Sequence, residues 1–486
     1  MNCPLNHIIQ AINPASVIGN ADKSICGVAI DSRKVEKGFL YAAMPGTITD
    51  GHAYIDQAIA AGASVILCQY IPNEHPDVTF LVVEHVAKAM GVACHLCYGE
   101  PTKKLQLVGT TGTNGKTTVS TLLFELFSSM GHRCGLISTV ENRIAGSIIP
   151  STHTTPDASG LNALLAQMVD ADCTYCFMEC SSHAIHQDRI AGLHFTGAVF
   201  TNITHDHLDY HHTFDNYIQA KKQFFDQLPS TAWALTNKDD RNGMVMLQNT
   251  KAARYTYAMK NGADFTVKIL ESDFQGMHLK LDGKEAWVNL VGAFNAYNLI
   301  AVYGAAFLLT SGEEEILIPL TSVPRVNGRF ESIAGPQRIT AIVDYAHTPD
   351  ALENVIKTIN DIRGNNAQLI TVVGCGGNRD AAKRPEMGAI AARFSNKVIL
   401  TSDNPRNENP EEIIRQMEEG VEGQYYKKLL KITDRQEAIR TAVMLAQPGD
   451  VILVAGKGHE TYQEIMGIKH PFDDKAILKT IFNQHQ

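Results

Sequence analysis

Residues 105–118 of this chain read Leu105-Gln-Leu-Val-Gly-Thr-Thr-Gly-Thr-Asn-Gly-Lys-Thr-Thr118. The apolar start predicts a buried strand, and the three glycines allow a tight loop whose backbone amides can point at an anion. Apolar residues then recur at helical spacing from Val119 to Met130, so the N-terminus of a helix faces the same anion. Lys116 adds a positive charge for the outer phosphates of a nucleotide, and Thr117 lies where a phosphate-loop hydroxyl holds Mg2+. The stretch departs from the strict eight-residue pattern at Thr110, which replaces the first glycine.

The length and composition of the chain indicate several domains and no membrane segment. Its 486 residues suggest about three domains. Hydrophobic residues make up 44% and charged residues 19%, with no apolar run long enough to cross a bilayer and no charged-then-apolar leader. We therefore expect a cytoplasmic protein without membrane insertion, and we expect a monomer. The net charge of −9, with no block of Lys and Arg, argues against a nucleic-acid partner and favours small anionic ligands.

Two cysteine pairs raise the alternative of a zinc site. Among ten cysteines, Cys94/Cys97 and Cys173/Cys176 are spaced as Cys-x-x-Cys and could together supply four thiolates. The first pair falls in an expected helix and the second in an apolar run, where small buried thiols are common. We favour a structural role for these cysteines.

The first 84 residues predict a small α/β domain. Its strand-like runs and its helical stretch alternate at residues 25–30, 39–43, 54–61 and 64–68. Asp31-Ser32-Arg33 follows a strand and could bind an anionic ligand, although a turn capped by Asp or Ser explains the same residues equally well. Another helical stretch leads into the phosphate-loop strand, so we place the first domain boundary between residues 84 and 85.

Residues 85–331 predict a central domain with a parallel sheet around the phosphate loop. Strand-like runs alternate with helical segments at residues 175–178, 198–202 and 232–236. Polar residues follow the first two strands, at 179–183 and 201–211. Ligands bind beside the carboxyl ends of parallel strands, so Glu179 and His207 are expected to gather beside the phosphate loop. Residues 291–298 open a long apolar helix, and residues 323–331 are expected to form a surface connection.

Residues 332–486 predict a third α/β domain with its own binding face. Strand signals return at residues 339–343, 369–373, 397–400 and 451–454. A polar cluster follows each strand: Asp344-Tyr-Ala-His-Thr-Pro349, Gly374-Cys-Gly-Gly-Asn-Arg379, Ser402-Asp-Asn-Pro-Arg406 and Gly456-Lys-Gly-His-Glu460. Four polar clusters at four strand ends imply a second ligand-binding edge.

Two other classes of protein share parts of these patterns. Three histidines within residues 205–211 approximate the metal cluster of binuclear hydrolases, but that cluster needs a histidine where the chain has Tyr210. Asn237-Lys-Asp-Asp240 fits the motif by which nucleotide-switch proteins read guanine. Such proteins also need Asp-x-x-Gly at a strand end, and Asp157-Ala-Ser-Gly160 follows Thr-Thr-Pro instead of an apolar run. Neither class explains the whole pattern, and the nucleotide switch is kept as the less favoured alternative.

Taken in chain order, the motifs closely resemble those of the Mur ligases. They are Gly112-Thr-Asn-Gly-Lys-Thr-Thr118, Thr154-Thr-Pro156, Glu179-Cys-Ser-Ser-His183 with Gln187 and Arg189, Asp206-His-Leu-Asp209, Asn295-x-x-Asn298, Gly328-Arg329, Asp344-Tyr-Ala-His-Thr-Pro349 and Asp403-Asn-Pro-Arg406. The resemblance runs nearly end to end. It implies an α/β fold of three domains: a smaller N-terminal domain, a central P-loop domain with a parallel sheet, and a Rossmann-like C-terminal domain.

The resemblance implies ATP-driven amide formation through an acyl phosphate, in the synthesis of peptidoglycan precursor. It is nearest to members that add the third peptide residue, which implies a UDP-N-acetylmuramoyl dipeptide and meso-diaminopimelate as substrates, with L-lysine as the alternative amino acid. Both chemical steps build up negative charge. By the resemblance, Lys116, Lys221 and His207 are catalytic, and Mg2+ is held by Thr117, Glu179, His207 and Lys221.

Lys221 matches the family's lysine that carries a CO2-derived carbamate, which turns an ammonium into an oxygen ligand for Mg2+. The neighbouring Lys222 leaves the register open, and a solvated helix lysine is the alternative interpretation of either residue.

The other site residues follow from the same position-by-position comparison. The nucleotide would be bound by Gly112, Thr113, Asn114, Gly115, Lys116, Thr117, Thr118, Asn295, Arg329, Asp344 and His347. The UDP-linked substrate would be bound by Ser32, Thr154, Thr155, Ser181, Gln187 and Arg189. The amino acid would be bound by Arg379, Asp403, Asn404, Pro405, Arg406, Gly456 and Glu460.

The choice of amino acid is expected to depend on Arg406. Its guanidinium can grip the second carboxylate of diaminopimelate, while Asn404 and Glu460 take the adjacent ammonium. L-Lysine lacks this carboxylate and would leave Arg406 unpaired, which predicts discrimination on the order of a thousandfold.

Overall fold

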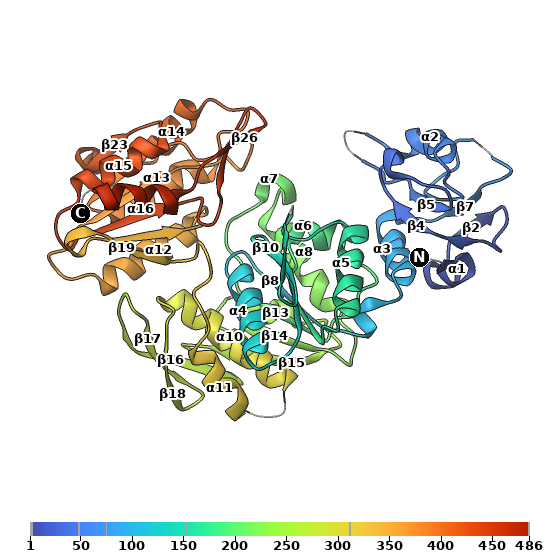
Figure 1. The fold of residues 1–486 in the computed structure, drawn as a ribbon, viewed down its shortest axis with the longest axis horizontal. Helices are drawn as coiled ribbons and strands as arrows, with labels where there is room; N and C mark the ends of the chain where they lie inside the picture. The colour runs from blue at the N-terminus through green and yellow to red at the C-terminus, as the bar shows by residue number, and fades with distance from the viewer. Residues whose placement is uncertain (1–2, 47–48, 74, 152, 311–312, 485–486) are drawn as a thin grey trace.

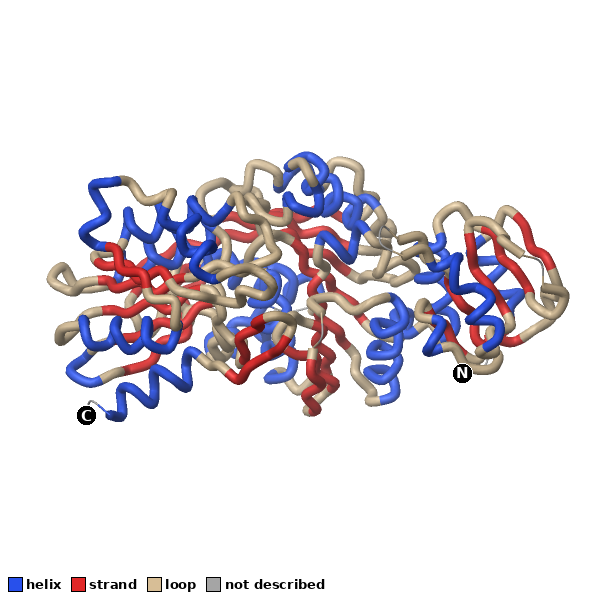
Figure 2. The backbone as a smooth tube through the Cα atoms, turned by 90° about the horizontal axis from the view of Figure 1, so that it is seen from above, coloured by secondary structure: helices blue, strands red, loops and turns tan. Residues whose placement is uncertain are grey.

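The computed structural model describes residues 3–46, 49–73, 75–151, 153–310 and 313–484. Three α/β units follow one another along an elongated molecule, from the N-terminal unit at the right of Figure 1 to the C-terminal unit at its left. Each unit has its own β-sheet, of five, eleven and six strands. Figure 2 shows the N-terminal unit at one end of the molecule, away from the C-terminal unit. No helix in the described ranges is long and apolar enough to cross a membrane.

The N-terminal unit is a five-stranded sheet in the order β2-β7-β6-β5-β4. Four strands are parallel, and β2 is antiparallel at the edge: β2 (Ser16–Ile18), β4 (Gly27–Ala29), β5 (Phe39–Ala42), β6 (Val65–Cys68) and β7 (Thr79–Val82). A separate short pair is formed by β1 (Cys3–Pro4) and β3 (Ser24–Ile25). The unit's α-helices are α1 (Leu5–Ile12) and α2 (Ile55–Ala60), and α3 (Val86–Cys97), which follows the unit in the chain, packs in the same core. The strands and helices expected from the pattern of this region are therefore present.

The central sheet has the order β11-β10-β9-β12-β8-β13-β14-β15-β16-β17-β18. Its seven inner strands run parallel: β8 (Gln106–Thr111), β9 (Cys134–Ile137), β12 (Tyr175–Glu179), β13 (Gly197–Phe200), β14 (Trp233–Asn237), β15 (Ala253–Ala258) and β16 (Phe265–Ser272). Neighbouring strand residues point to opposite faces, so Val108 packs in the core with α4 (Lys116–Ser129) and α10 (Ala293–Leu309). Leu107 packs in the opposite core with α5 (Ala158–Asp170) and α8 (Phe214–Asp226). Burial on both faces explains why β8, β12, β13 and β14 contain apolar runs, whereas β15 and β16 each have exposed residues.

Antiparallel strands extend both edges of the central sheet. The pattern of apolar residues did not predict these strands. One edge carries β10 (Glu141–Ile144) and β11 (Ser147–Pro150), and the other carries β17 (Met277–Leu281) and β18 (Lys284–Val288). These strands are half-exposed, so they alternate polar and apolar residues instead of forming continuous apolar runs.

The C-terminal sheet has the order β19-β20-β24-β21-β22-β23. Only β19 is antiparallel: β19 (Glu331–Ala334), β20 (Thr340–Asp344), β21 (Leu369–Val373), β22 (Lys397–Leu400), β23 (Leu429–Lys431) and β24 (Val451–Ala455). Its helices are α12 (Pro349–Ile362), α13 (Lys383–Phe394), α14 (Pro410–Glu418), α15 (Arg435–Leu445) and α16 (Asp474–Gln484). A hairpin of β25 (Tyr462–Ile465) and β26 (Ile468–Pro471) stands beside this sheet.

The connection between the last two units is fixed to the central unit. Val323 and Val326 are buried in the core beside α10, so the prediction of a surface connection for residues 323–331 was wrong at these positions. Arg325 donates hydrogen bonds of 2.8–2.9 Å to the backbone carbonyls of Phe274, Gln275 and Asn289. The C-terminal unit is therefore attached to the β16–β18 region through more than the chain itself.

Candidate active site

The phosphate loop lies between β8 and α4 and needs its glycines. Gly112 and Gly115 have φ of +151° and +89°, conformations that other residues rarely adopt. A Cβ on Gly112 would lie 1.9 Å from Thr201 Oγ1, so the loop and the end of β13 approach too closely for a larger residue. Thr110 is fully buried within β8. Its departure from the strict pattern therefore affects the strand and not the loop.

Lys116 and Thr117 start α4 and lie at the mouth of this loop. The Lys116 ammonium donates to the carbonyls of Gly112 and Thr113 at 3.0 and 2.9 Å, and burial lowers its pKa. Thr117 Oγ1 accepts a 3.1 Å hydrogen bond from Arg329 Nη2. The predicted P-loop lysine and hydroxyl are thus adjacent, and an arginine from the region that joins the last two units already reaches them.

Glu179 ends β12, the strand beside the phosphate loop, and carries an unpaired oxygen. Its Oε1 accepts a 2.7 Å hydrogen bond from the Thr139 amide. The residue is 0% exposed, and its Oε2 has no hydrogen-bond partner among the described residues. A buried, unpaired carboxylate oxygen is costly and indicates a missing cation or donor.

Lys221 and Lys222 occupy different environments on α8. Lys221 is buried, donates a 2.8 Å hydrogen bond to the Gly112 carbonyl and lies 4.6 Å from the Tyr217 ring centre. Burial lowers the pKa of Lys221 well below its ordinary value. Lys222 instead pairs with Asp226 on its own helix at 2.6 Å. Only Lys221 contacts the phosphate loop.

Residues predicted for the UDP-linked substrate form one network beside Glu179. Thr155 Oγ1 donates to the Glu179 carbonyl at 2.7 Å and accepts from the Ser181 amide at 3.2 Å. Arg189 donates to the Thr155 carbonyl at 2.9 Å and to Gln187 Oε1 at 2.6 Å. The hydroxyls of Thr154 and Thr139 are 3.0 Å apart. Ser32 is separate from this network: it lies in the N-terminal unit, where its hydroxyl donates to Gln57 at 3.1 Å.

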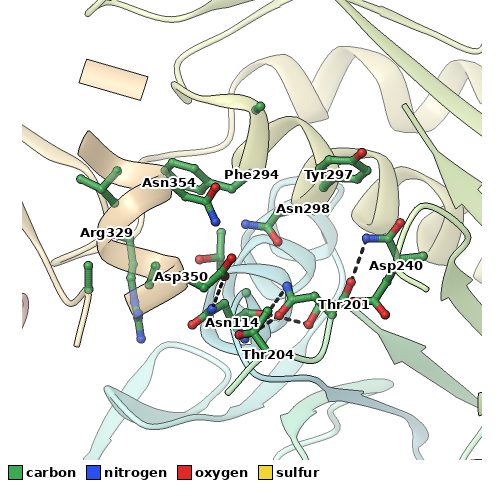
Figure 3. A pocket seen from close by; sticks show the side chains of 18 of the residues that line it. Asn114, Thr201, Thr204, Asp240, Phe294, Tyr297, Asn298, Arg329, Asp350 and Asn354 are labelled. Carbon is green, nitrogen blue, oxygen red and sulfur yellow. Dashed lines mark hydrogen bonds between the residues drawn. The ribbon is translucent and has the colours of Figure 1, made fainter. Parts of the chain in front are cut away.

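A cavity of about 420 Å³ opens beside the phosphate loop and is walled by both larger units. Of the residues predicted for the nucleotide, Asn114, Gly115, Thr118, Arg329, Asp344 and His347 line it. Asn295 does not line it and instead accepts a 3.2 Å hydrogen bond from Asn298, which does. Asn114 donates to Asp350 of α12 at 3.0 Å across the cavity (Figure 3).

Other residues of this cavity were missed by the sequence analysis. Asn354 and Asp350 line it outside every motif that we recognised, and Tyr297 lines it between the two asparagines of Asn295-x-x-Asn298. The Asn237-Lys-Asp-Asp240 motif also borders the cavity, but Asp239 is occupied by the Tyr297 hydroxyl at 2.7 Å and by backbone amides. Asp240 accepts from the Ile203 amide at 2.9 Å. These carboxylates therefore hold loops in place and are not free to read guanine.

A second polar cluster lies at the strand ends of the C-terminal sheet. Asn404 accepts a hydrogen bond from the buried Lys457 ammonium at 3.0 Å and donates to Glu460 Oε2 at 2.8 Å. Arg406 donates to the Gly377 carbonyl at 2.8 Å, and its Nε lies 3.3 Å from Glu464 Oε2. Lys457 and Glu464 were missed, although Lys457 lies inside a predicted strand-end cluster.

The other residues predicted for the amino acid take different places around this cluster. Asp403 is buried, and a Cβ on Gly456 would lie 2.5 Å from its Oδ2. Pro405 places its carbonyl against Gly377, where a Cβ would lie 1.9 Å away. Arg379 is exposed on the neighbouring loop. Glycines at positions 377 and 456 thus let three loops meet at one place.

The arrangement has counterparts among known proteins. The description "Mur ligase family, catalytic domain" matches residues 24–101, "Mur ligase middle domain" residues 110–306 and "Mur ligase, glutamate ligase domain" residues 328–458. The chain is 53% identical over 481 residues to UDP-N-acetylmuramoyl-L-alanyl-D-glutamate--2,6-diaminopimelate ligase of Cytophaga hutchinsonii, with 99% of both chains covered. This chain belongs to the Mur ligase family. The correspondingly named ligase of Bacteroides fragilis is 54% identical over 480 residues, with 99% of each chain covered.

A solved structure supports the same assignment for this Mur ligase. The structure of a UDP-N-acetylmuramoyl-L-alanyl-D-glutamate--2,6-diaminopimelate ligase covers 100% of both chains with a TM-score of 0.70 and 33% identity. The resemblance predicted a fold of three α/β units, with the P-loop sheet in the central unit, and this prediction is confirmed.

The residues of this Mur ligase suit Mg2+ at the phosphate loop, although the protein alone does not complete a metal site. In the described part of the chain, no three His, Cys, Asp or Glu side chains gather closely enough to hold a metal ion. Glu179 nevertheless offers a buried oxygen without a partner. Burial lowers the pKa of His207, so its ring is neutral and can bind a metal. Oxygen ligands from phosphates usually complete Mg2+ sites of this kind.

Proposed function

We propose that this Mur ligase joins meso-2,6-diaminopimelate to UDP-N-acetylmuramoyl-L-alanyl-D-glutamate and converts ATP to ADP and phosphate. The observation that carries the proposal is the shared wall of the nucleotide cavity. Asn114 of the central unit binds Asp350 of the C-terminal unit, and Arg329 reaches Thr117. A ligase must bring a nucleotide, an acid and an amine together, whereas neither a switch nor a hydrolase requires a second binding edge.

The proposed reaction has two displacement steps. An oxygen of the D-glutamyl carboxylate bonds to the γ-phosphorus as the bond to the bridging oxygen breaks, and ADP leaves with that electron pair. The amine nitrogen of diaminopimelate then bonds to the acyl carbon, phosphate leaves with the electrons of the broken C–O bond, and the amine loses a proton to solvent. Lys116 and Arg329 are placed to stabilise the charge on the phosphate oxygens.

We assign Mg2+ to Thr117, Glu179, His207 and a carbamate on Lys221, and the bound ion would supply charge neutralisation at the phosphates. The carbamate is supported by the burial of Lys221, which lowers its pKa well below the ordinary value and so favours the neutral amine that can add to CO2 and release a proton. Its position against the Gly112 carbonyl supports a role at the loop.

The substrates are assigned to the two polar edges. Thr154, Thr155, Ser181, Gln187 and Arg189 hold the peptide end of the UDP-linked substrate beside Glu179, and Ser32 contacts its nucleotide end. The cluster of Asn404, Arg406 and Glu460 binds the amino acid. We also propose domain boundaries at residues 84/85 and 331/332 and a monomeric, cytoplasmic enzyme.

Phosphate release tests this proposal directly. We expect release only when ATP, the UDP-linked dipeptide and meso-diaminopimelate are present together, with a product heavier by one diaminopimelate residue in mass spectrometry. Omitting each substrate in turn is the control. Release with GTP that ignores the amino acid would instead support a nucleotide switch, and release without any nucleotide would support a hydrolase.

A further inference from the structure

Lys383 is a buried cation without a sufficient partner. It is the first residue of α13 in the C-terminal unit and is 6% exposed. Its one ion pair within the described ranges joins its Nζ to Asp206 Oδ1 of the central unit, at 3.9 Å. That distance is too long for a hydrogen bond, and no other described group accepts one from this ammonium. An ammonium has three protons to donate, and burying it unpaired is costly.

The next residue, Arg384, is also a buried cation, but its hydrogen bonds give it a structural role. Arg384 is 1% exposed and donates to both oxygens of Glu408, to Gln416 and to the Gly376 carbonyl, at 2.7–3.2 Å. These bonds fix the start of α13 without help from Lys383. The side chain of Lys383 is therefore free to serve another purpose.

The loop before α13 places Lys383 at the catalytic edge of the central sheet. Asp380 pairs with His205 of the central unit at 3.2 Å and also accepts from the Ala382 amide at 2.9 Å. Asp206, next to His205, interacts electrostatically with both Lys116 and Lys383. Lys383 thus lies beside a carboxylate that also interacts with the phosphate-loop lysine, although it belongs to a different unit.

The cations around the loop differ in their hydrogen-bond partners. Lys116, Arg329 and Lys383 are cations, and each of the carboxylates Glu179, Asp206 and Asp344 interacts with at least one of them. Lys116 and Arg329 donate to groups of the protein, whereas no described group accepts a hydrogen bond from Lys383. A phosphate oxygen beside Lys383 would supply the missing acceptor.

We propose that Lys383 is a further catalytic residue, which binds the oxygens of the phosphoryl group that moves from ATP to the substrate carboxylate. It keeps its proton throughout: the bond to the bridging oxygen of ATP breaks, the bond to the carboxylate oxygen forms, and the ammonium stabilises the charge on the three remaining oxygens. Because Lys383 comes from the C-terminal unit, this stabilisation requires the two units to be together. The inference deepens the proposed ligase function and rests on it.

Lys383→Met tests the inference, with Asp380→Asn as the matched control on the same loop. In Lys383→Met we expect kcat to fall by about 100- to 1,000-fold, the usual effect of removing one charge-stabilising donor. Lys383→Arg should recover part of the loss. Asp380→Asn breaks the contact with His205 but keeps the lysine, and should cost less than about fivefold. Unchanged kcat in Lys383→Met, or equal losses in both variants, would overturn the inference.

Nucleotide binding separates this inference from the ligase proposal. With Mg2+, Lys383→Met should weaken binding of the β,γ-imido analogue of ATP by about tenfold or more relative to ADP, because only the analogue carries a γ-phosphate. Calorimetric titration of both nucleotides measures this ratio without any ligase turnover. An unchanged ratio refutes the role of Lys383, whereas a wild type that releases no phosphate with all three substrates refutes the ligase function alone.

Discussion

Replacing Arg406 by methionine tests how the enzyme selects its amino acid. The Arg406 guanidinium is held from two sides, by the Gly377 carbonyl at 2.8 Å and by Glu464 at 3.3 Å. Within the described ranges its Nη2 donates no hydrogen bond, so one edge remains for the second carboxylate of diaminopimelate. Methionine keeps an unbranched side chain about as long as the aliphatic stem of arginine and removes every donor.

The pairing with Glu464 changes the magnitude expected from the sequence. A thousandfold preference assumes that L-lysine leaves Arg406 unpaired, but Glu464 remains as its partner when lysine binds. When L-lysine replaces diaminopimelate, the complex lacks one charge-assisted hydrogen bond, which lowers the binding free energy by about 1.5–3 kcal/mol. At 1.36 kcal/mol for each tenfold, that is a preference of about 10- to 150-fold in kcat/KM.

The assay compares kcat/KM for meso-diaminopimelate and L-lysine in three proteins. The wild type should show the preference above, and Arg406→Met should lose most of it through diaminopimelate alone. In Glu464→Gln the guanidinium has no protein carboxylate, so the preference should rise toward a thousandfold. Equal losses for both amino acids in Arg406→Met, with an unchanged melting temperature, would refute the role of the guanidinium in specificity.

Four further substitutions test the phosphate loop. Lys116→Ala should abolish phosphate release without lowering the melting temperature by more than a few degrees, because among the described residues its ammonium donates only to carbonyls of its own loop; retained turnover with ATP would remove it from the site. Lys221→Ala should be nearly inactive and partly rescued by short carboxylates, whereas Lys222→Ala, which loses an ion pair with Asp226, should mainly lower the melting temperature; rescue of the second variant instead would place the carbamate there. Glu179→Gln should raise the Mg2+ concentration for half-maximal activity by about tenfold or more, and an unchanged Mg2+ requirement would contradict its role as a ligand.

Local patterns predicted inner strands that are buried on both faces, such as β12, β13 and β14, but not β9, β15 and β16 of the central sheet. Residues 369–373 and 397–400, for example, form β21 and β22 with the expected bounds. The edge strands β17 and β18 were missed because they do not form apolar runs. Asp282-Gly283 between alternating segments is a strong hairpin signal and could have revealed them.

Motifs also predicted which side chains meet within one unit. Thr155 contacts both Glu179 and Arg189, as expected for residues that the resemblance assigned to neighbouring parts of one site. The partner of Arg406 was not predictable in this way. Glu464 lies on a hairpin 58 residues further on, in a segment with no recognised motif, and only the backbone pairing of Arg406 with Ile465 brings it near.

Contacts between units are the hardest contacts to predict from the sequence. In this protein they bring the proposed catalytic residues together. Asn114 and Asp350 belong to different units and are 236 residues apart. Arg329, in the connection between these units, is 212 residues from Thr117. Neither pair belongs to a common periodic pattern, because the two units are independent sheets whose relative placement depends on the buried connection at Val323 and Val326. Lys383 reaches Asp206 for the same reason. An ammonium supplied by one unit to a phosphate held by another can act only when the units meet, so transfer from ATP becomes conditional on the presence of the unit that binds the amine.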